Sequence, residues 1–143
     1  MTLIKQVSYL IAAMAAAAVP AQASCDGSGG YVELSGAQIR SLVNTSIVCY
    51  PAVPPYTNQE AHAGGIITDY KQGPTDPVDP SVQVGTYTVP IGPTAQITYS
   101  YTGGGTYAYT VWGISTSGPG SYDFCGGSPS PLTVRVVSGS GPC

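Results

Sequence analysis

Apolar and aromatic residues alternate with small polar ones in short runs that glycine and proline separate. Residues 95–101 and 106–112 show the clearest alternation, with the period of two that is typical of half-buried strands. The same pattern predicts eight strands, at residues 45–50, 58–63, 66–70, 84–89, 95–101, 106–112, 121–125 and 132–137. Eight short strands between turn residues indicate a small antiparallel β-barrel or sandwich.

One segment has the period of a helix instead. Ser35 and Gln38 have the spacing of a capping box, in which each side chain bonds to the backbone N–H of the other residue. Ile39, Leu42 and Val43 then share one face. The pattern predicts one N-terminal helix over residues 35–43 in a mainly β domain.

Three glycines at residues 103–105 predict a hairpin that brings tyrosines together. The expected cross-strand pairs, all on one face, are Tyr101 with Tyr107, Tyr99 with Tyr109, and Ile97 with Val111. The four tyrosines would form a ladder. It either covers the core or presents a contact surface to a partner.

The first 23 residues predict a secretory signal peptide. Lys5 precedes an apolar run at residues 7–19, and Pro20 is followed by an Ala-Gln-Ala cleavage pattern ending at Ala23. We therefore expect residues 24–143 to form a single secreted domain, extracellular or periplasmic, with no membrane span in the mature chain.

The chain has few charged residues, and this limits the classes of molecule that it is expected to bind. Charged residues make up 8% of the chain, against about 25% in an ordinary domain. Cleavage after Ala23 would leave three basic and seven acidic residues, a net charge of −4. No basic patch remains for nucleic acid or anionic lipid. An uncharged surface suits contact with other proteins or with copies of the same chain.

Four cysteines in an exported protein predict two structural disulfides. Sequence alone allows three pairings. We favour Cys49 with Cys125, joining two strands, and Cys25 with Cys143, fastening both glycine-rich ends. The sequence contains no C-x-x-C motif, which would have indicated a thiol enzyme or a zinc site.

Recognisable catalytic motifs are absent from the sequence. One cluster merits attention. If Gly64 and Gly65 form a two-residue turn, Glu60 pairs directly with Asp69, and His62 lies on the same face. Two facing carboxylates repel each other, so a cation or a shared proton lies between them, or the register differs. No cofactor or metal is expected. If the chain has a metal or acid–base site at all, these three residues are the candidates for it, and this is the weakest of the functional hypotheses.

Two further polar features have ordinary explanations. Asp76 and Asp79 lie in a proline-rich loop and supply too few oxygens for Ca²⁺, so they are expected to be solvated. Asn44, with Thr45 and Ser46, fits the N-glycosylation pattern.

The stretch L-S-G-A-Q-I-R-S-L at residues 34–42, with Gly-Thr-Tyr at residues 85–87, resembles a group of small exported bacterial proteins of unknown function. Residues 69–74 and 76–80 are also similar to such proteins. The resemblance implies a calycin-like barrel or sheet preceded by a helix. It implies no activity.

Three functions compete at this stage. The first is a non-catalytic secreted or surface domain that acts by protein contact, with self-assembly into a filament or matrix as one form. The second is a calycin-like barrel that holds a small apolar ligand or a partner protein, with a cavity lined by residues such as Ile97, Val111, Tyr87 and Leu132. The weakest is a metal-dependent hydrolase centred on Glu60, His62 and Asp69.

Overall fold

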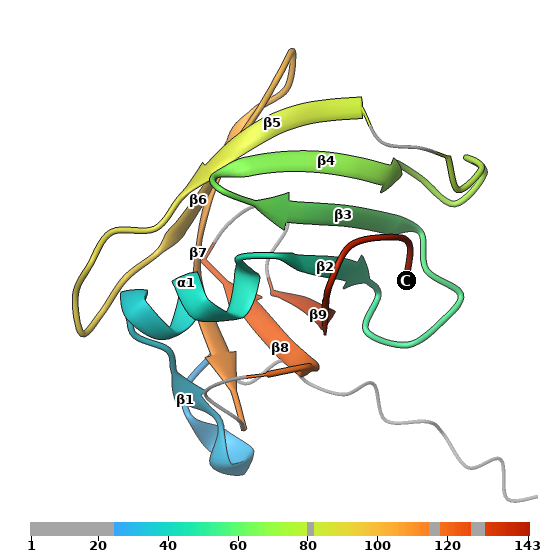
Figure 1. Ribbon diagram of the computed structural model, residues 1–143. Coiled ribbons are helices and arrows are strands. Elements are labelled where there is room, and N and C mark those ends of the chain that lie inside the picture. Colours follow the sequence, from blue (N-terminus) through green and yellow to red (C-terminus); the bar gives the residue numbers. More distant parts are fainter. Residues whose placement is uncertain (1–24, 80–81, 115–117, 127–130) are drawn as a thin grey trace, which may run out of the picture.

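Eight antiparallel strands close into a barrel in the computed structural model of the chain, which describes residues 25–79, 82–114, 118–126 and 131–143 (Figure 1). Each strand pairs with the next, and β2 pairs with β9 to complete the barrel. The strands are β2 (Ser46–Tyr50), β3 (Asn58–Ala63), β4 (Ile66–Lys71), β5 (Val82–Thr88), β6 (Ile97–Tyr101), β7 (Thr106–Gly113), β8 (Gly120–Cys125) and β9 (Leu132–Ser138). The predicted mainly β fold with eight strands is confirmed, as a barrel. The predicted signal peptide lies outside the described residues.

The N-terminal segment crosses one end of this barrel. A 3₁₀ turn (Ser28–Gly30) leads to β1 (Val32–Glu33), a two-residue strand that pairs with β7 and that the sequence pattern did not predict. Helix α1 (Gly36–Val43) follows. The predicted capping box is present: the Ser35 backbone N–H donates to Gln38 Oε1 at 2.8 Å, and the Gln38 backbone N–H donates to Ser35 Oγ at 3.4 Å.

Helix α1 helps fill one half of the molecule with apolar side chains. Ile39, Leu42 and Val43 are buried, as predicted, in one cluster with Ile97 and Val111. A backbone hydrogen bond of 2.8 Å from the Leu34 N–H to the Val111 carbonyl ties the start of this segment to β7. This end of the barrel is therefore a packed core.

The first helical residue lies against the loop between β5 and β6. The Gly36 N–H donates to the Gly92 carbonyl at 2.9 Å, and a Cβ at Gly36 would collide with the Pro90 carbonyl oxygen. Only glycine allows the helix to begin this close to the loop.

Two glycine turns set the registers of the hairpins that matter for the interior. Gly64 and Gly65 have φ values of 58° and 84° and close a two-residue turn, so Glu60 lies opposite Asp69 as predicted. The tyrosine hairpin differs from its prediction by two residues, because Tyr99 pairs with Tyr107 rather than with Tyr109. A shift of two preserves the face that each side chain occupies.

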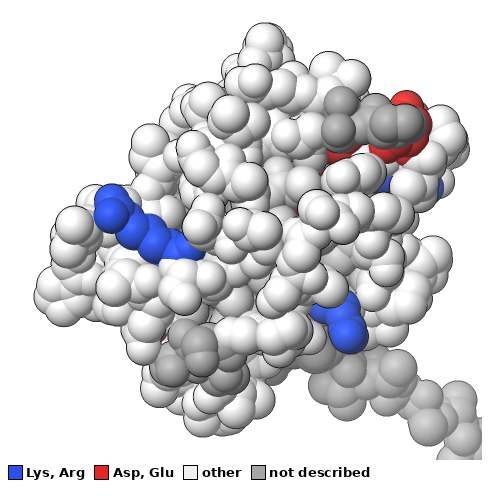
Figure 2. All heavy atoms as spheres, in the orientation of Figure 1, with Lys and Arg blue, Asp and Glu red and all other residues white. Residues whose placement is uncertain are grey.

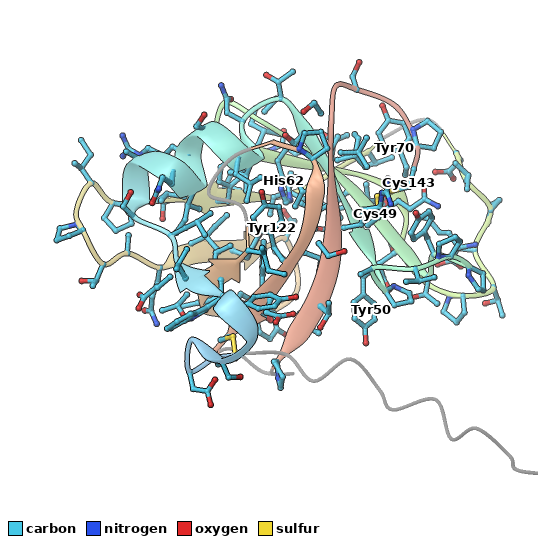
Figure 3. All side chains as sticks on the ribbon, turned by 90° about the horizontal axis from the view of Figure 1, so that it is seen from below. Cys49, Tyr50, His62, Tyr70, Tyr122 and Cys143 are labelled. Carbon is cyan, nitrogen blue, oxygen red and sulfur yellow. A yellow bond between two sulfur atoms is a disulfide. The ribbon has the colours of Figure 1, made fainter. Side chains whose placement is uncertain are left out.

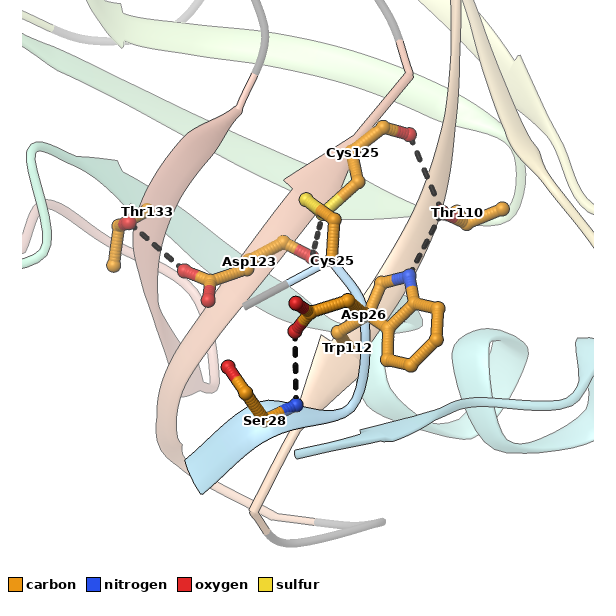
Figure 4. Close-up of a disulfide and its surroundings, with 8 residues drawn as sticks. All are labelled: Cys25, Asp26, Ser28, Thr110, Trp112, Asp123, Cys125 and Thr133. Carbon is orange, nitrogen blue, oxygen red and sulfur yellow. Dashed lines mark hydrogen bonds between the residues drawn. A yellow bond between two sulfur atoms is a disulfide. The ribbon is translucent and has the colours of Figure 1, made fainter. Parts of the chain in front are cut away.

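Two disulfides hold the ends of the described chain. Cys25 is bonded to Cys125 on β8 (Figure 4), and Cys49 on β2 is bonded to Cys143 (Figure 3). All four cysteines are in disulfides, but the favoured pairing was wrong. Strand β9 lies between β2 and β8, and strands two positions apart are about 10 Å apart, too far for a disulfide between facing residues.

The first disulfide lies over the outer wall of β7 and β8. Around it, Trp112 Nε1 donates to Thr110 Oγ1 at 3.0 Å, and Thr133 Oγ1 donates to Asp123 Oδ1 at 2.8 Å (Figure 4). Asp123 is only 1% exposed. This carboxylate thus belongs to the wall beneath the N-terminal segment and not to the barrel interior.

The outer surface is poor in charge, as the composition indicates. Figure 2 shows one face that is almost free of charge, with a few basic side chains and one group of acidic atoms at its edge. Among the helices of the described residues, none is long and apolar enough to cross a membrane.

Candidate functional site

A cavity of about 260 Å³ occupies the half of the barrel that α1 does not fill. Its lining comes from the ends of β2, β6 and β8 and the starts of β3, β7 and β9. Strands that alternate in direction bring these positions to the same end of the barrel. The cavity therefore lies at this end of the barrel, opposite the Gly64–Gly65 turn.

Aromatic rings form most of the cavity wall. The lining includes Tyr50, Tyr99, Tyr101, Tyr107, Tyr109 and Phe124. Val48, Leu132 and Val134 add aliphatic surface. Of the lining residues expected for a ligand-binding barrel, only Leu132 is among them; Ile97 and Val111 belong to the packed core, and Tyr87 packs against His62.

Tyrosine rings of β6 meet those of β7 at steep angles, whereas Tyr99 and Tyr101, both on β6, are nearly parallel at 14°. Tyr99 and Tyr109 lie edge to face, with centroids 6.1 Å apart and planes at 67°. Tyr101 and Tyr107 repeat this arrangement at 6.0 Å and 64°. Because Tyr99 and Tyr109 are only 4% and 5% exposed, they do not form the outer contact surface that was one interpretation of the ladder. Tyr101 and Tyr107 are half-buried on the same inner face.

Glu60 is the charged residue of the cavity. Its Oε2 accepts a 3.0 Å hydrogen bond from the Tyr101 hydroxyl, and His62 Nε2 lies 3.5 Å away from the same oxygen. None of the described residues donates a hydrogen bond to Glu60 Oε1, and no Lys or Arg among them lies within 4.0 Å of this carboxylate. The carboxylate, on a side chain that is 21% exposed, thus lines the aromatic cavity, and its Oε1 accepts no hydrogen bond from the described residues.

Two neighbouring side chains, His62 and Tyr99, carry buried polar atoms that make no hydrogen bond to the described residues. His62, labelled in Figure 3, is 1% exposed. It packs against the rings of Tyr87 and Tyr99, at centroid distances of 5.2 Å and 5.4 Å. Neither nitrogen of His62 has a hydrogen-bond partner in the described part of the chain, nor has the hydroxyl of Tyr99. Buried polar groups are usually paired, so unpaired ones beside a cavity indicate a place where a ligand or solvent can bond.

The electrostatics of the interior disfavour additional negative charge. Burial raises the pKa of Tyr99 well above its usual value, and the neighbouring Tyr101 and Glu60 raise it further. Burial followed by the Glu60 charge also raises the pKa of Tyr101. For Tyr109, burial, Tyr107 and Glu60 act in the same direction. These phenols stay neutral under physiological conditions.

Asp69 is the second carboxylate of this end of the barrel. It lies directly across from Glu60 in the β3–β4 pairing and is 6% exposed. Glu60, Asp69 and Tyr101 together line a second, more open pocket of about 560 Å³ beside the first. Among the described residues, no three His, Cys, Asp or Glu side chains are grouped to hold a metal ion. Glu60, His62 and Asp69 are thus neighbours without forming such a group.

The remaining polar candidates lie outside the barrel. Asp76 and Asp79 are exposed; the Asp76 carbonyl accepts from Lys71 Nζ at 2.7 Å, and the Asp79 N–H donates to the Tyr70 carbonyl at 3.0 Å. Asn44 is exposed, and its Oδ1 accepts from the Gly64 N–H at 3.2 Å. These contacts order loops and leave the cavity unaffected.

Comparisons of the chain with protein-family models, with curated proteins and with solved structures found no significant match. The resemblance of residues 34–42 to small exported bacterial proteins stays a prediction. The functional argument therefore depends on the geometry of the cavity.

Proposed function

We propose that the protein binds a small, mostly apolar ligand inside its barrel. The observation that carries the proposal is the aromatic cavity of about 260 Å³. An eight-stranded barrel has an interior just wide enough either to be filled by its own side chains or to hold one small ligand. Here one half is filled and the other is hollow, with a few polar groups among apolar walls, as is typical of ligand sites.

A neutral fluorescent probe tests this proposal. N-phenyl-1-naphthylamine should bind saturably, and its emission should rise as it enters the apolar cavity. Val48→Phe places a larger side chain in the cavity wall and should weaken binding by about tenfold or more, because overpacking leaves no room for the probe. Val32→Phe is the matched control, because Val32 is 45% exposed on β1. It should bind the probe like the original protein.

Two results would contradict the proposal. One is the absence of saturable binding. The other is equal binding by the Val48→Phe variant, provided that its circular dichroism shows an intact fold, because the probe would then occupy another surface.

The location of the protein is part of the same proposal. Two disulfides are compatible with an oxidising compartment. We propose that the protein works outside the cytoplasm, secreted or periplasmic, and collects its ligand there. Cell fractionation with an antibody to the protein tests this directly.

The contact and self-assembly function stays a prediction, now with less support. Its aromatic argument relied on the tyrosine ladder, whose rings line the interior. The low charge of the surface is its remaining support. The prediction that the protein is not an enzyme also stays a prediction.

A further inference from the structure

We propose that the ligand is a protonated amine with a small apolar or aromatic body, whose ammonium group binds at Glu60. This inference rests on the proposed ligand-binding function and names the chemical class that the cavity selects. The supporting observation is that the Glu60 carboxylate lies among aromatic rings in the cavity and that its Oε1 accepts no hydrogen bond from the described residues.

Charge complementarity is the first argument. Glu60 and Asp69 are direct cross-strand neighbours on the inner face, and like charges in that position destabilise a sheet. In the described part of the chain, no Lys or Arg lies within 4.0 Å of either carboxylate, and the basic side chain beside them is His62, whose Nε2 lies 3.5 Å from Glu60 Oε2. A cation at this end of the barrel would relieve the repulsion, whereas an anionic ligand would increase it.

The aromatic walls are the second argument. The edge-to-face pairs Tyr99–Tyr109 and Tyr101–Tyr107 form steeply angled walls around the same space. A cation over the face of an aromatic ring is attracted by the ring quadrupole, and this attraction grows when water is excluded. The remainder of the lining, including Val134 and Phe124, provides an apolar surface for the body of the ligand.

Unpaired polar groups distinguish an ammonium with N–H donors from a quaternary ammonium. Glu60 Oε1 accepts no hydrogen bond from the described residues, and the buried Tyr99 hydroxyl has no partner. Both atoms can accept, and a protonated primary amine carries three donors. Hydrogen bonds to a charged group are the stronger kind. The site therefore fits a primary or secondary amine better than a fully alkylated one.

Three probes with a common phenyl body test the assignment by isothermal titration calorimetry. They are 2-phenylethylamine as the cation, 2-phenylethanol as the neutral compound and phenylacetate as the anion. The protein used is the full mature chain with both disulfides formed. The amine should bind about tenfold or more tightly than the alcohol, and phenylacetate should bind most weakly.

Variants then assign the preference to Glu60. Glu60→Gln keeps an acceptor for the Tyr101 hydroxyl and removes the charge. The affinity for the amine should fall to within about twofold of that for the alcohol, whose own affinity should hardly change. Glu33→Gln on β1 is the matched control, with the same chemical change away from the cavity lining. It should keep the full preference. Asp69→Asn should lower the preference less than Glu60→Gln does.

Each result decides the assignment separately from the proposed function. Absence of amine binding, equal binding of amine and alcohol, or an unchanged preference in Glu60→Gln overturns the amine assignment. Saturable binding of N-phenyl-1-naphthylamine in the same preparation would then still support the ligand-binding barrel. Failure of that probe as well would overturn both.

Discussion

The hydroxyl of Tyr101 on β6 donates a 3.0 Å hydrogen bond to Glu60 on β3, joining two strands that β4 and β5 separate in the sheet. The bond crosses the interior and leaves the carboxylate facing both the aromatic cavity and the open pocket beside Asp69. Single substitutions can measure how much this bond, and each of the other interior side chains, contributes to the free energy of unfolding.

Tyr101→Phe removes this bond and keeps the ring. We expect the free energy of unfolding to fall by about 1 to 2 kcal/mol, because Glu60 loses its tyrosine donor. Urea denaturation gives the value. Tyr107→Phe, on the facing strand, is the control and should change stability by less than about 0.5 kcal/mol. Equal losses in both variants would show that the bond contributes nothing specific.

Tyr99 separates the contribution of a ring from that of its hydroxyl. Tyr99→Ala should cost about 3 to 5 kcal/mol, since it empties space in the core cluster. Tyr99→Phe should be neutral or stabilising, because the buried hydroxyl that it removes has no partner. Thermal unfolding of both variants measures this. A large loss in Tyr99→Phe would mean that the hydroxyl is bonded in solution.

Gly36 reverses the usual rule for helices. Alanine has a higher helix propensity than glycine by about 1 kcal/mol, yet Gly36→Ala should destabilise the protein, because its Cβ would collide with the Pro90 carbonyl. The opposite change at the next residue, Ala37→Gly, is exposed and should lose only about 0.5 to 1 kcal/mol. Chemical denaturation of the two variants gives the signs. Stabilisation by Gly36→Ala would contradict the close packing.

Alkaline pH should weaken the fold through the interior tyrosines. The pKa values of Tyr99, Tyr101 and Tyr109 are raised in the folded protein, chiefly by burial, so the unfolded chain loses these protons first. Their stabilising contribution is complete below pH of about 10 and declines as the pH rises further, by up to about 1.4 kcal/mol per unit for each tyrosine. Urea titrations between pH 8 and pH 11 measure the decline. Constant stability across this range would contradict the burial of these phenols.

Local patterns sufficed for much of the fold. The capping box at Ser35, the alternation along β6 and β7 and the two-residue turn at Gly64 each involve neighbours in sequence, and each was predicted. At residues 103–105, three glycines permit several loop geometries, so the sequence did not determine which tyrosines pair, and the observed pairing is shifted by two residues. The alternation of side chains along each strand still predicted correctly which face the tyrosines occupy.

Long-range geometry could not be obtained in the same way. The disulfide partners depend on β9 lying between β2 and β8, which follows from how the barrel closes. The position of the cavity depends on which half of the barrel α1 fills. For this reason Ile97 and Val111 lie in the packed core, whereas Glu60 and Phe124 line the cavity. Glu60, His62 and Asp69 were identified as a group from the turn register. Their relation to the tyrosines required the closed barrel.

The two disulfides give the described chain an interlocked covalent pattern, because the ring closed by Cys25 and Cys125 overlaps the ring closed by Cys49 and Cys143. A single backbone cleavage anywhere between Cys25 and Cys143 falls inside at least one ring. The two fragments therefore stay attached to each other wherever a protease cuts once. A nicked molecule would keep its full mass apart from one added water and would separate into two fragments only after reduction, so the disulfides make the covalent chain tolerant of a single proteolytic cut.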